Sequence, residues 1–280
     1  MMTRASRCPR NRGGIDTALA LTASALLVAC GGEDAPGADS TADAMNDAPA
    51  ASTSPDAAPA HNALTDPEIA DGWMLLFDGE TTEGWRRYGA EDFPEGGWQV
   101  IDGELVGQSS DGDMDGGDIV TRAEFTDFEI VFDFKVGPEG NSGVFYRVRE
   151  TEGKGLWQVA PEYQVLDDPA YIAMGTMDMN THLTGDNYDL HATASKTMNP
   201  TGEWNTGRIV VEGNRVEHWL NGEMTVAYEL YSDDWEARVA ASKFGVEEAY
   251  ARAPSGAIGL QDHGTPVWYR NIKIRPLGDG

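Results

Sequence analysis

Basic residues are scarce in this chain. Its 280 residues include 20 Lys and Arg against 47 Asp and Glu, which gives a formal net charge of -27 at pH 7. Nucleic-acid phosphates require a cationic face, so this balance excludes a free-standing nucleic-acid binder and disfavours docking on anionic lipid through basic patches. Cysteine is also scarce, and 2 Cys cannot build a disulfide scaffold.

Aromatic residues are missing from the N-terminal part, since all 8 Trp, 9 Tyr and 8 Phe lie at or beyond Trp73. Residues 1–12 carry four Arg and no acid, and residues 17–29 are all apolar or small. A basic start followed by a short apolar run is typical of a secretory signal, and the run is too short for a membrane span. The sequence therefore predicts export.

The end of this run, Leu27-Val28-Ala29-Cys30, resembles the lipobox of bacterial lipoproteins. In that family the Cys becomes the N-terminus of the mature protein and carries several acyl chains, which give stable anchoring. The resemblance implies a signal peptide over residues 1–29 and lipid on Cys30. Gly31 follows, where Asp would favour inner-membrane retention, so the expected location is the outer membrane or periplasm. The alternative is an ordinary secretory signal with a chance Cys.

Residues 31–62 contain no aromatic residue and no Lys or Arg. Such a segment cannot bury enough apolar surface to offset its ordering entropy, so residues 30–64 are predicted to be a disordered, acidic, Ala- and Pro-rich tether. One folded domain is then expected over residues 65–280.

Short strands dominate the pattern of this domain. Apolar and polar residues alternate over 128–135, and turn residues separate further runs at 98–107, 141–147, 208–220, 258–261 and 268–274. A single helix is expected, beginning at Ser232 and running towards Lys243. The prediction is an all-β sandwich or jelly roll with one short helix.

An ordered set of motifs points to one family. The motifs lie at residues 77–79, 84–85, 117–121, 141–147, 162–167, 202–205, 219–222, 259–263 and 269–272. Together they resemble the 3-keto-disaccharide hydrolase domain family over about residues 70–277. The resemblance implies a concanavalin-A-like jelly roll that acts on 3-keto-glycosides, sugars already oxidised at C3 by a separate oxidoreductase.

The chemistry of such a substrate defines what its site must contain. A C3 carbonyl acidifies the C2 proton, and loss of that proton allows the enolate to expel the aglycone from C1. The site needs a base near C2, a donor for the enolate oxygen and an acid for the leaving group, rather than the two opposed carboxylates of an ordinary glycosidase. No resident cofactor is expected.

Two groups of polar residues are the first candidates for this site. Glu162 and Gln164 share one face of a strand, and Arg147 shares the face of Phe145 on another, so Arg147 could bind an enolate and Glu162 act as base. Gln261 and His263 form the second group, with His263 as a proton-transfer residue. The alternatives are an Arg–Glu pair that spans neighbouring strands and a loop His that binds its own turn.

Further residues are candidates for binding the substrate, because their hydrogen-bonding groups or aromatic faces suit a sugar. They are Asp167, Tyr188, Lys196, Glu203, Trp204, Glu217 and Lys243. Trp204 could instead fill the core, either Lys could simply be solvated, and His218 is expected to be structural or exposed. Asp111, Asp113, Asp115 and Asp118 have calcium-loop spacing, but Arg122 occupies the twelfth position, so a solvated acidic loop is expected and calcium is the alternative.

Three functions remain compatible with the sequence. The main one is a cell-envelope enzyme that cleaves 3-keto-glycosides through loss of the C2 proton. A non-catalytic, lectin-like lipoprotein of the same fold is the alternative. A conventional β-glucanase is less favoured, because its Glu-x-Asp-x-x-Glu strand is absent.

Overall fold

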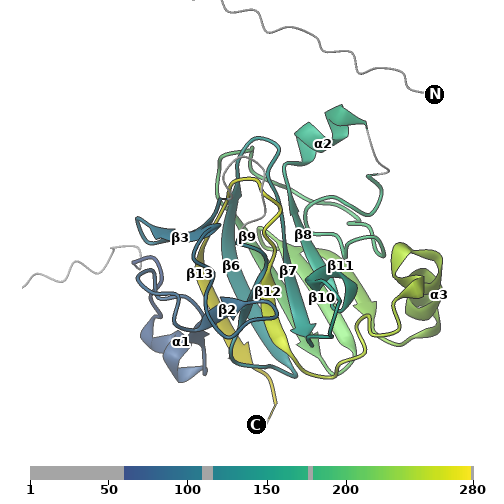
Figure 1. The fold of residues 1–280 in the computed structure, drawn as a ribbon, viewed down its shortest axis with the longest axis horizontal. Helices are drawn as coiled ribbons and strands as arrows, with labels where there is room; N and C mark the ends of the chain where they lie inside the picture. The colour runs from purple at the N-terminus through teal and green to yellow at the C-terminus, as the bar shows by residue number, and fades with distance from the viewer. Residues whose placement is uncertain (1–59, 109–115, 176–178, 279–280) are drawn as a thin grey trace, which may run out of the picture. The chain divides into compact units, whose positions relative to one another are not determined.

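The computed structural model describes residues 60–108, 116–175 and 179–278. Two antiparallel sheets stack in layers, with the helices at the periphery (Figure 1). The larger sheet has the order β11 (Glu223–Glu229), β10 (Arg215–Leu220), β9 (Asn205–Glu212), β6 (Phe128–Val136), β13 (Val267–Pro276), β4 (Glu104–Gly107) and β3 (Trp98–Ile101), and β1 (Met74–Leu75) also pairs with β13. The smaller sheet has the order β2 (Trp85–Arg87), β5 (Ile119–Thr121), β12 (Ala257–Leu260), β7 (Asn141–Val148) and β8 (Glu162–Leu166). This is the predicted jelly-roll sandwich.

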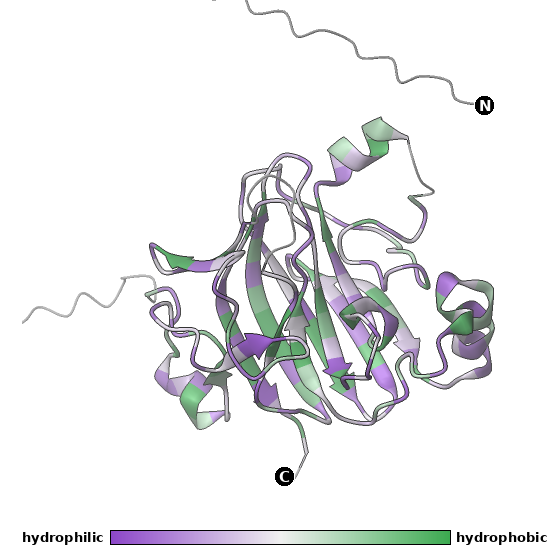
Figure 2. Cartoon of the chain, in the orientation of Figure 1, coloured by the Kyte–Doolittle hydropathy of each residue, from purple (hydrophilic) through white to green (hydrophobic). Residues whose placement is uncertain are grey.

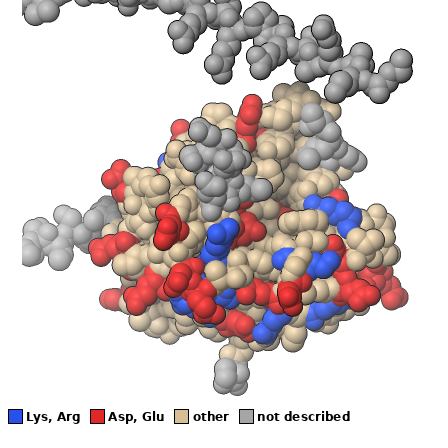
Figure 3. All heavy atoms as spheres, viewed as in Figure 1, with Lys and Arg blue, Asp and Glu red and all other residues tan. Residues whose placement is uncertain are grey.

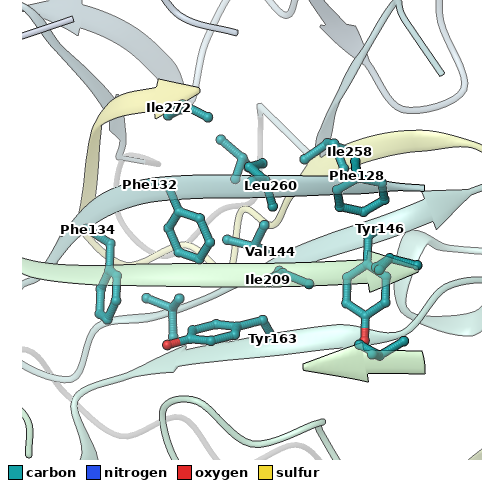
Figure 4. Close-up of a cluster of buried hydrophobic side chains, with 14 of the residues drawn as sticks. Phe128, Phe132, Phe134, Val144, Tyr146, Tyr163, Ile209, Ile258, Leu260 and Ile272 are labelled. Carbon is teal, nitrogen blue, oxygen red and sulfur yellow. The ribbon is translucent and has the colours of Figure 1, made fainter. Parts of the chain in front are cut away.

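The core lies between the two sheets. Phe128, Ile130, Phe132 and Phe134 of β6 are at most 1% exposed, which confirms the predicted alternation. Side chains of the smaller sheet pack against them, and they include Val144, Tyr146, Tyr163, Ile258 and Leu260 (Figure 4). The same alternation colours the strands in Figure 2, where apolar and polar positions follow one another.

A second, smaller apolar cluster covers the outer face of the five-stranded sheet. It contains Val120, Phe145, Val148, Leu156, Val159, Ala160 and Ala257. Leu156 comes from a 3-10 turn, η2 (Leu156–Gln158), that folds back over this face and contacts the position of Gly259. The cluster therefore closes one end of the outer face, next to the pocket described below.

The predicted helix is present as α3 (Asp233–Ala241), in which the Ser232 hydroxyl accepts the N–H of Trp235 and Trp235 and Val239 are buried. A 3-10 turn, η3 (Lys243–Val246), follows it. The expectation of a single helix is wrong. The capping box of Thr65 and Glu68 begins α1 (Asp66–Ala70), and α2 (Asp168–Met174) follows β8.

The packed domain includes residues before position 65. The buried Asn62 exchanges two backbone-to-side-chain hydrogen bonds with Asn271, each 2.7 Å long, and its amide donates to Gly103 O. These bonds attach the chain to β13. Among the described residues, no helix has the length and apolar character to cross a membrane.

Candidate active site

A pocket of about 370 Å³ opens on the outer face of the five-stranded sheet. Its volume is in the range of small-ligand sites. It is lined by Asp118, Asn141, Gly155, Trp157, Glu162, Gln164, Tyr188, Lys243, Gln261, Asp262 and His263. Acidic side chains are spread over the face of the domain seen in Figure 3, with fewer basic ones between them.

The floor of the pocket is a row of residues that crosses four strands. Leu260 pairs with Ile119 on one side and with Val144 on the other. One residue further on, Gln261 therefore lies between Asp118 and Gly143, and its N–H donates to Gly143 O. Gly143 in turn pairs with Gln164 of β8. The antiparallel register thus brings residues far apart in sequence into one line.

Glu162 enters this row because Gly143 has no side chain. A Cβ atom on Gly143 would lie 2.1 Å from Glu162 Oε1 and 2.7 Å from its Cδ, so the carboxyl group rests on the glycine of the neighbouring strand. Glu162 is 4% exposed. Burial raises the pKa of Glu162 to about 8, the Lys243 ammonium opposes this shift, and the charge of Asp118 adds to it.

Lys243 supplies the positive charge of the pocket. Its Nζ lies 3.2 Å from Tyr188 Oη, 4.2 Å from the centroid of the Tyr188 ring and 4.8 Å from that of Trp157. Partial desolvation lowers the pKa of Lys243, while the negative charge of Glu162 opposes this shift. Burial raises the pKa of Tyr188, so both groups can donate protons in hydrogen bonds at neutral pH.

Asp118 and Asp262 form the opposite wall. The Asp262 N–H donates to Asp118 Oδ1 over 3.0 Å, and Asp262 Oδ1 accepts the N–H of Gly264. Burial raises the pKa of Asp118 to about 6, the charge of Asp262 adds to this, and the Asp262 N–H and Arg87 oppose it. The pocket therefore has carboxylates on two sides and a lysine on one.

Several polar groups in the pocket face no protein partner. Within the described ranges, no hydrogen bond reaches the carboxyl of Glu162 or the side chains of Asn141, Gln261 and His263. Glu162 is the buried member of this set, and buried polar groups in folded proteins are normally paired. A buried carboxyl group without a partner, at a cavity that Asn141 and Gln261 also line, indicates a polar ligand.

The structure brings together six of the residues predicted from sequence. They are Glu162, Gln164, Tyr188, Lys243, Gln261 and His263, from β8, the segment after it, η3 and the end of β12. His263 is exposed on the rim. Asp262 also lines the pocket, because β12 ends at Leu260 and the strand alternation stops there.

The expected position of Arg147 is wrong. Its φ of 53° lies at a register shift between β7 and β12, a β-bulge that breaks the alternation with Phe145. The guanidinium turns away from the pocket, donates to Thr126 O and Gly213 O, and pairs with Asp127 at 3.1 Å. Glu162 and Arg147 are therefore not partners, and the cation of the pocket is Lys243.

This position of Arg147 predicts a structural effect on substitution. Arg147→Met should lower the free energy of unfolding by about 2–4 kcal/mol, because it leaves buried carbonyl groups without donors. Urea denaturation would measure the loss, and kcat of the folded fraction should stay within about two-fold of the wild type. A variant with unchanged stability and much reduced kcat would show that Arg147 acts in the reaction.

The remaining predicted residues also lie outside the pocket. Asp167 accepts hydrogen bonds from Glu139 N and Thr201 Oγ1, and Lys196 pairs with Asp168. The prediction that Glu203, Trp204 and Glu217 bind substrate in this pocket is also wrong. Glu217 lies on β10, and Glu203 and Trp204 directly precede β9, and both strands belong to the eight-stranded sheet.

On that sheet these residues have other contacts. The ring of Trp204 lies 3.9 Å from the Arg270 guanidinium and 4.7 Å from Lys135 Nζ. Glu217 accepts from Arg215 and Trp219, and Glu203 is exposed. His218 is structural, since it is 0% exposed and lies between Gly185 O and the Tyr146 hydroxyl.

Five residues of the pocket are not among the site residues selected from the sequence, and one of them is Gly155. Asp118 and Asn141 stand inside the recognised motifs, and Asp262 stands next to two selected residues. Trp157 is 38% exposed and lies on η2. This turn has only three residues, so it shows no periodic pattern in the sequence. Residues 111–115 of the acidic loop lie outside the described residues. In the described part, no cluster of three or more His, Cys, Asp or Glu is placed to bind a metal ion.

Comparison with known proteins finds relatives described as glycoside hydrolases. A 3-keto-disaccharide hydrolase from Bacteroides thetaiotaomicron is 32% identical over 215 residues, which cover 69% of this chain and 74% of that protein. A crystal structure from Parabacteroides distasonis, described as a candidate glycosyl hydrolase, is 35% identical with a TM-score of 0.71 and covers 78% of this chain and 100% of its own.

A second candidate glycosyl hydrolase from Parabacteroides distasonis shares the fold, with 24% identity and a TM-score of 0.56 over 73% of this chain and 99% of its own. Residues 72–275 match a family described as the 3-keto-alpha-glucoside-1,2-lyase-like domain. That match covers most of the chain and every pocket residue named above. The chain is a member of the 3-keto-alpha-glucoside-1,2-lyase-like domain family.

Proposed function

We propose that this protein is a glycoside-processing enzyme that cleaves 3-keto-glycosides. The observation that carries the proposal is the convergence of a buried carboxyl group, Glu162, with an ammonium group, Lys243, and unpaired amides in one pocket of about 370 Å³. Family membership and the similarity to a 3-keto-disaccharide hydrolase support this substrate class.

In the proposed reaction, Glu162 removes the proton from C2 of the keto sugar. With a raised pKa of about 8, its ionised form is a stronger base than an ordinary carboxylate, which suits abstraction from carbon, and this form becomes more populated as the pH rises towards 8. The electrons of the C2–H bond form the enolate, and Lys243 with the Tyr188 hydroxyl stabilises its C3 oxygen. Lys243 thus takes the role first expected of Arg147.

The enolate then expels the aglycone. The C1–O bond breaks as the C1–C2 double bond forms, and the leaving oxygen takes a proton. Addition of water at C1, with return of a proton to C2, completes hydrolysis. No electrons are exchanged with the protein, because a separate sugar 3-oxidoreductase makes the ketone beforehand, so the proposed reaction requires no resident redox cofactor.

The test is release of an aryl group from two matched substrates. The purified full chain should release nitrophenol from 4-nitrophenyl 3-keto-glucoside at least about 10³-fold faster than from the parent glucoside, because only the ketone acidifies C2. Binding of the keto sugar without release above the buffer rate would overturn the enzymatic proposal and support the lectin-like alternative.

Trp157 offers an aromatic face at the rim, suited to stacking on a sugar ring. Trp157→Ala should raise KM by about 10-fold, corresponding to about 1.4 kcal/mol of lost binding, and leave kcat nearly unchanged. Steady-state kinetics on a 3-keto-disaccharide would measure both. Trp204→Ala is the matched control, since that ring lies on the other sheet, and an equal effect of both substitutions would contradict the assignment.

We further propose that the domain acts in the cell envelope. The signal-like residues 1–29 and the lipobox at Cys30 support lipid attachment, and the acidic segment that follows supports a spacer between membrane and enzyme. Cys30→Ser should release the protein from the membrane fraction. Retention of that variant in the membrane fraction would contradict lipid anchoring through Cys30.

A further inference from the structure

The pocket contains a second carboxyl group placed for proton transfer. Asp118 directly precedes β5, and Glu162 belongs to β8 at the other end of the row. Their strands are not neighbours, because β12 and β7 lie between them. Two carboxyls on opposite walls leave room for a sugar between them.

The register gives the spacing of the two groups. The Glu162 carboxyl rests over Gly143 on β7, and Gln261 lies between Gly143 and Asp118. Two strand spacings separate Gly143 from Asp118, so their Cα atoms are about 10 Å apart. Both carboxyl groups line the same pocket, and the charge of Asp118 acts on Glu162 across this gap.

The hydrogen bonds of Asp118 leave one oxygen available. Oδ1 accepts the Asp262 N–H, which fixes the orientation of the carboxyl group. Within the described ranges, Oδ2 has no hydrogen-bond donor, and Asp118 lines the pocket. Burial and the charge of Asp262 raise the pKa of Asp118 to about 6, above that of an ordinary Asp. Because the pKa of Glu162 is higher, about 8, the pair reacts from its minor form, in which Asp118 is protonated and Glu162 is ionised.

The charges around Glu162 orient the substrate. Lys243 is the cation that acts on Glu162, so the C3 oxygen and the C2 proton belong at the β8 side of the pocket. C1 and its leaving oxygen then point along the row, past Gln261 and towards Asp118. From this geometry we infer that Asp118 is the general acid that protonates the leaving oxygen, opposite the base Glu162.

The inferred step balances without any further reactant. As the enolate collapses, the C1–O bond breaks and its electron pair goes to the leaving oxygen, which takes the proton from Asp118 Oδ2. Asp118 is then ionised and Glu162 protonated. When water adds at C1, Asp118 takes a proton from the water and Glu162 returns its proton to C2, which restores both groups.

The inference rests on the proposed function and is tested by leaving-group dependence. A nitrophenolate leaves without protonation, whereas methoxide or a sugar alkoxide needs an acid. Asp118→Asn keeps the side-chain shape and an oxygen for the Asp262 N–H. It should lower kcat/KM about 10²–10³-fold for methyl 3-keto-glucoside and less than about 5-fold for the 4-nitrophenyl compound.

The control is His263→Ala, which removes the other candidate acid from the rim. It should affect both substrates alike and by less than about 10-fold. Equal losses for the two leaving groups in Asp118→Asn would show a positioning role, and selective loss in His263→Ala would assign the acid to His263. Either result overturns the inference. Wild-type activity on neither keto-glycoside would instead refute the proposed function.

Discussion

Glu162→Gln should reduce kcat/KM on 4-nitrophenyl 3-keto-glucoside by about 10³-fold, because the amide cannot accept the C2 proton. The change keeps the shape of the side chain, so the pocket should still bind the keto sugar. Steady-state kinetics would measure the loss of rate, and calorimetric titration would measure the retained binding. Activity within ten-fold of the wild type would rule out Glu162 as the base.

The same substitution should stabilise the fold at alkaline pH. Burial raises the pKa of Glu162 from 4.5 to about 8, so the folded chain holds a proton that the unfolded chain loses between these values. The contribution of this proton to the stability of the wild type is therefore fully present below pH 4.5 and is lost as the pH rises through 8. An amide at this position has no such proton to lose, so the Glu162→Gln variant should be more stable than the wild type by about 2–4 kcal/mol at about pH 8.5 and similar to it at about pH 4.5.

Urea denaturation at the two pH values would measure this difference. Glu248→Gln is the matched control, because Glu248 is exposed and its substitution removes the same formal charge without changing a buried group. If the stability difference between Glu162→Gln and the wild type does not change with pH, burial does not raise the pKa of Glu162. In that case a loss of rate in Glu162→Gln could not be attributed to a buried base with a raised pKa.

The sequence predicts the sandwich well, because its strongest signal is local. The alternation in β6 depends only on residues that are neighbours along one strand, and the turn residues between strands mark where each strand ends. It also places Glu162, Gln164 and Gln261 correctly, because each lies within or just beyond a regular strand where side chains alternate.

The errors arise where structure depends on contacts between distant segments. The bulge at Arg147 is set by the register of β7 against β12, more than a hundred residues later, and no local pattern reveals it. Motif membership suggests a place in the site for Trp204 and Glu217, but their strands join the other sheet. Trp157 escapes prediction because a single 3-10 turn has too few residues to show a period.

Gly143→Ala should lower kcat/KM by about 10²-fold while the protein remains folded. The new methyl group would lie 2.1 Å from the present position of Glu162 Oε1, so the carboxyl group must move. Displacement of a catalytic group by about 1 Å can cost about 10²-fold in rate. Gly143 is not among the glycines of positive φ, so its backbone accepts Ala without strain.

Steady-state kinetics and thermal denaturation would test this pair of expectations. Gly84→Ala is the matched control, because its Cβ would meet only Leu76 O at 3.6 Å and its φ is also not positive. The control should retain full activity. A Gly143→Ala variant with wild-type kcat/KM would show that the Glu162 carboxyl does not need its place over β7.

A double-mutant cycle separates this steric effect from general damage to the sheet. Glu162→Ala removes Oε1, Cδ and Cγ, the three atoms that the methyl group of Gly143→Ala would meet. If the glycine acts only by making room, Gly143→Ala should cost much less free energy of unfolding in the Glu162→Ala background than in the wild type. Equal costs in both backgrounds would place the effect in the backbone of β7. The base of this site would then depend on strand geometry rather than on the missing side chain of its neighbour.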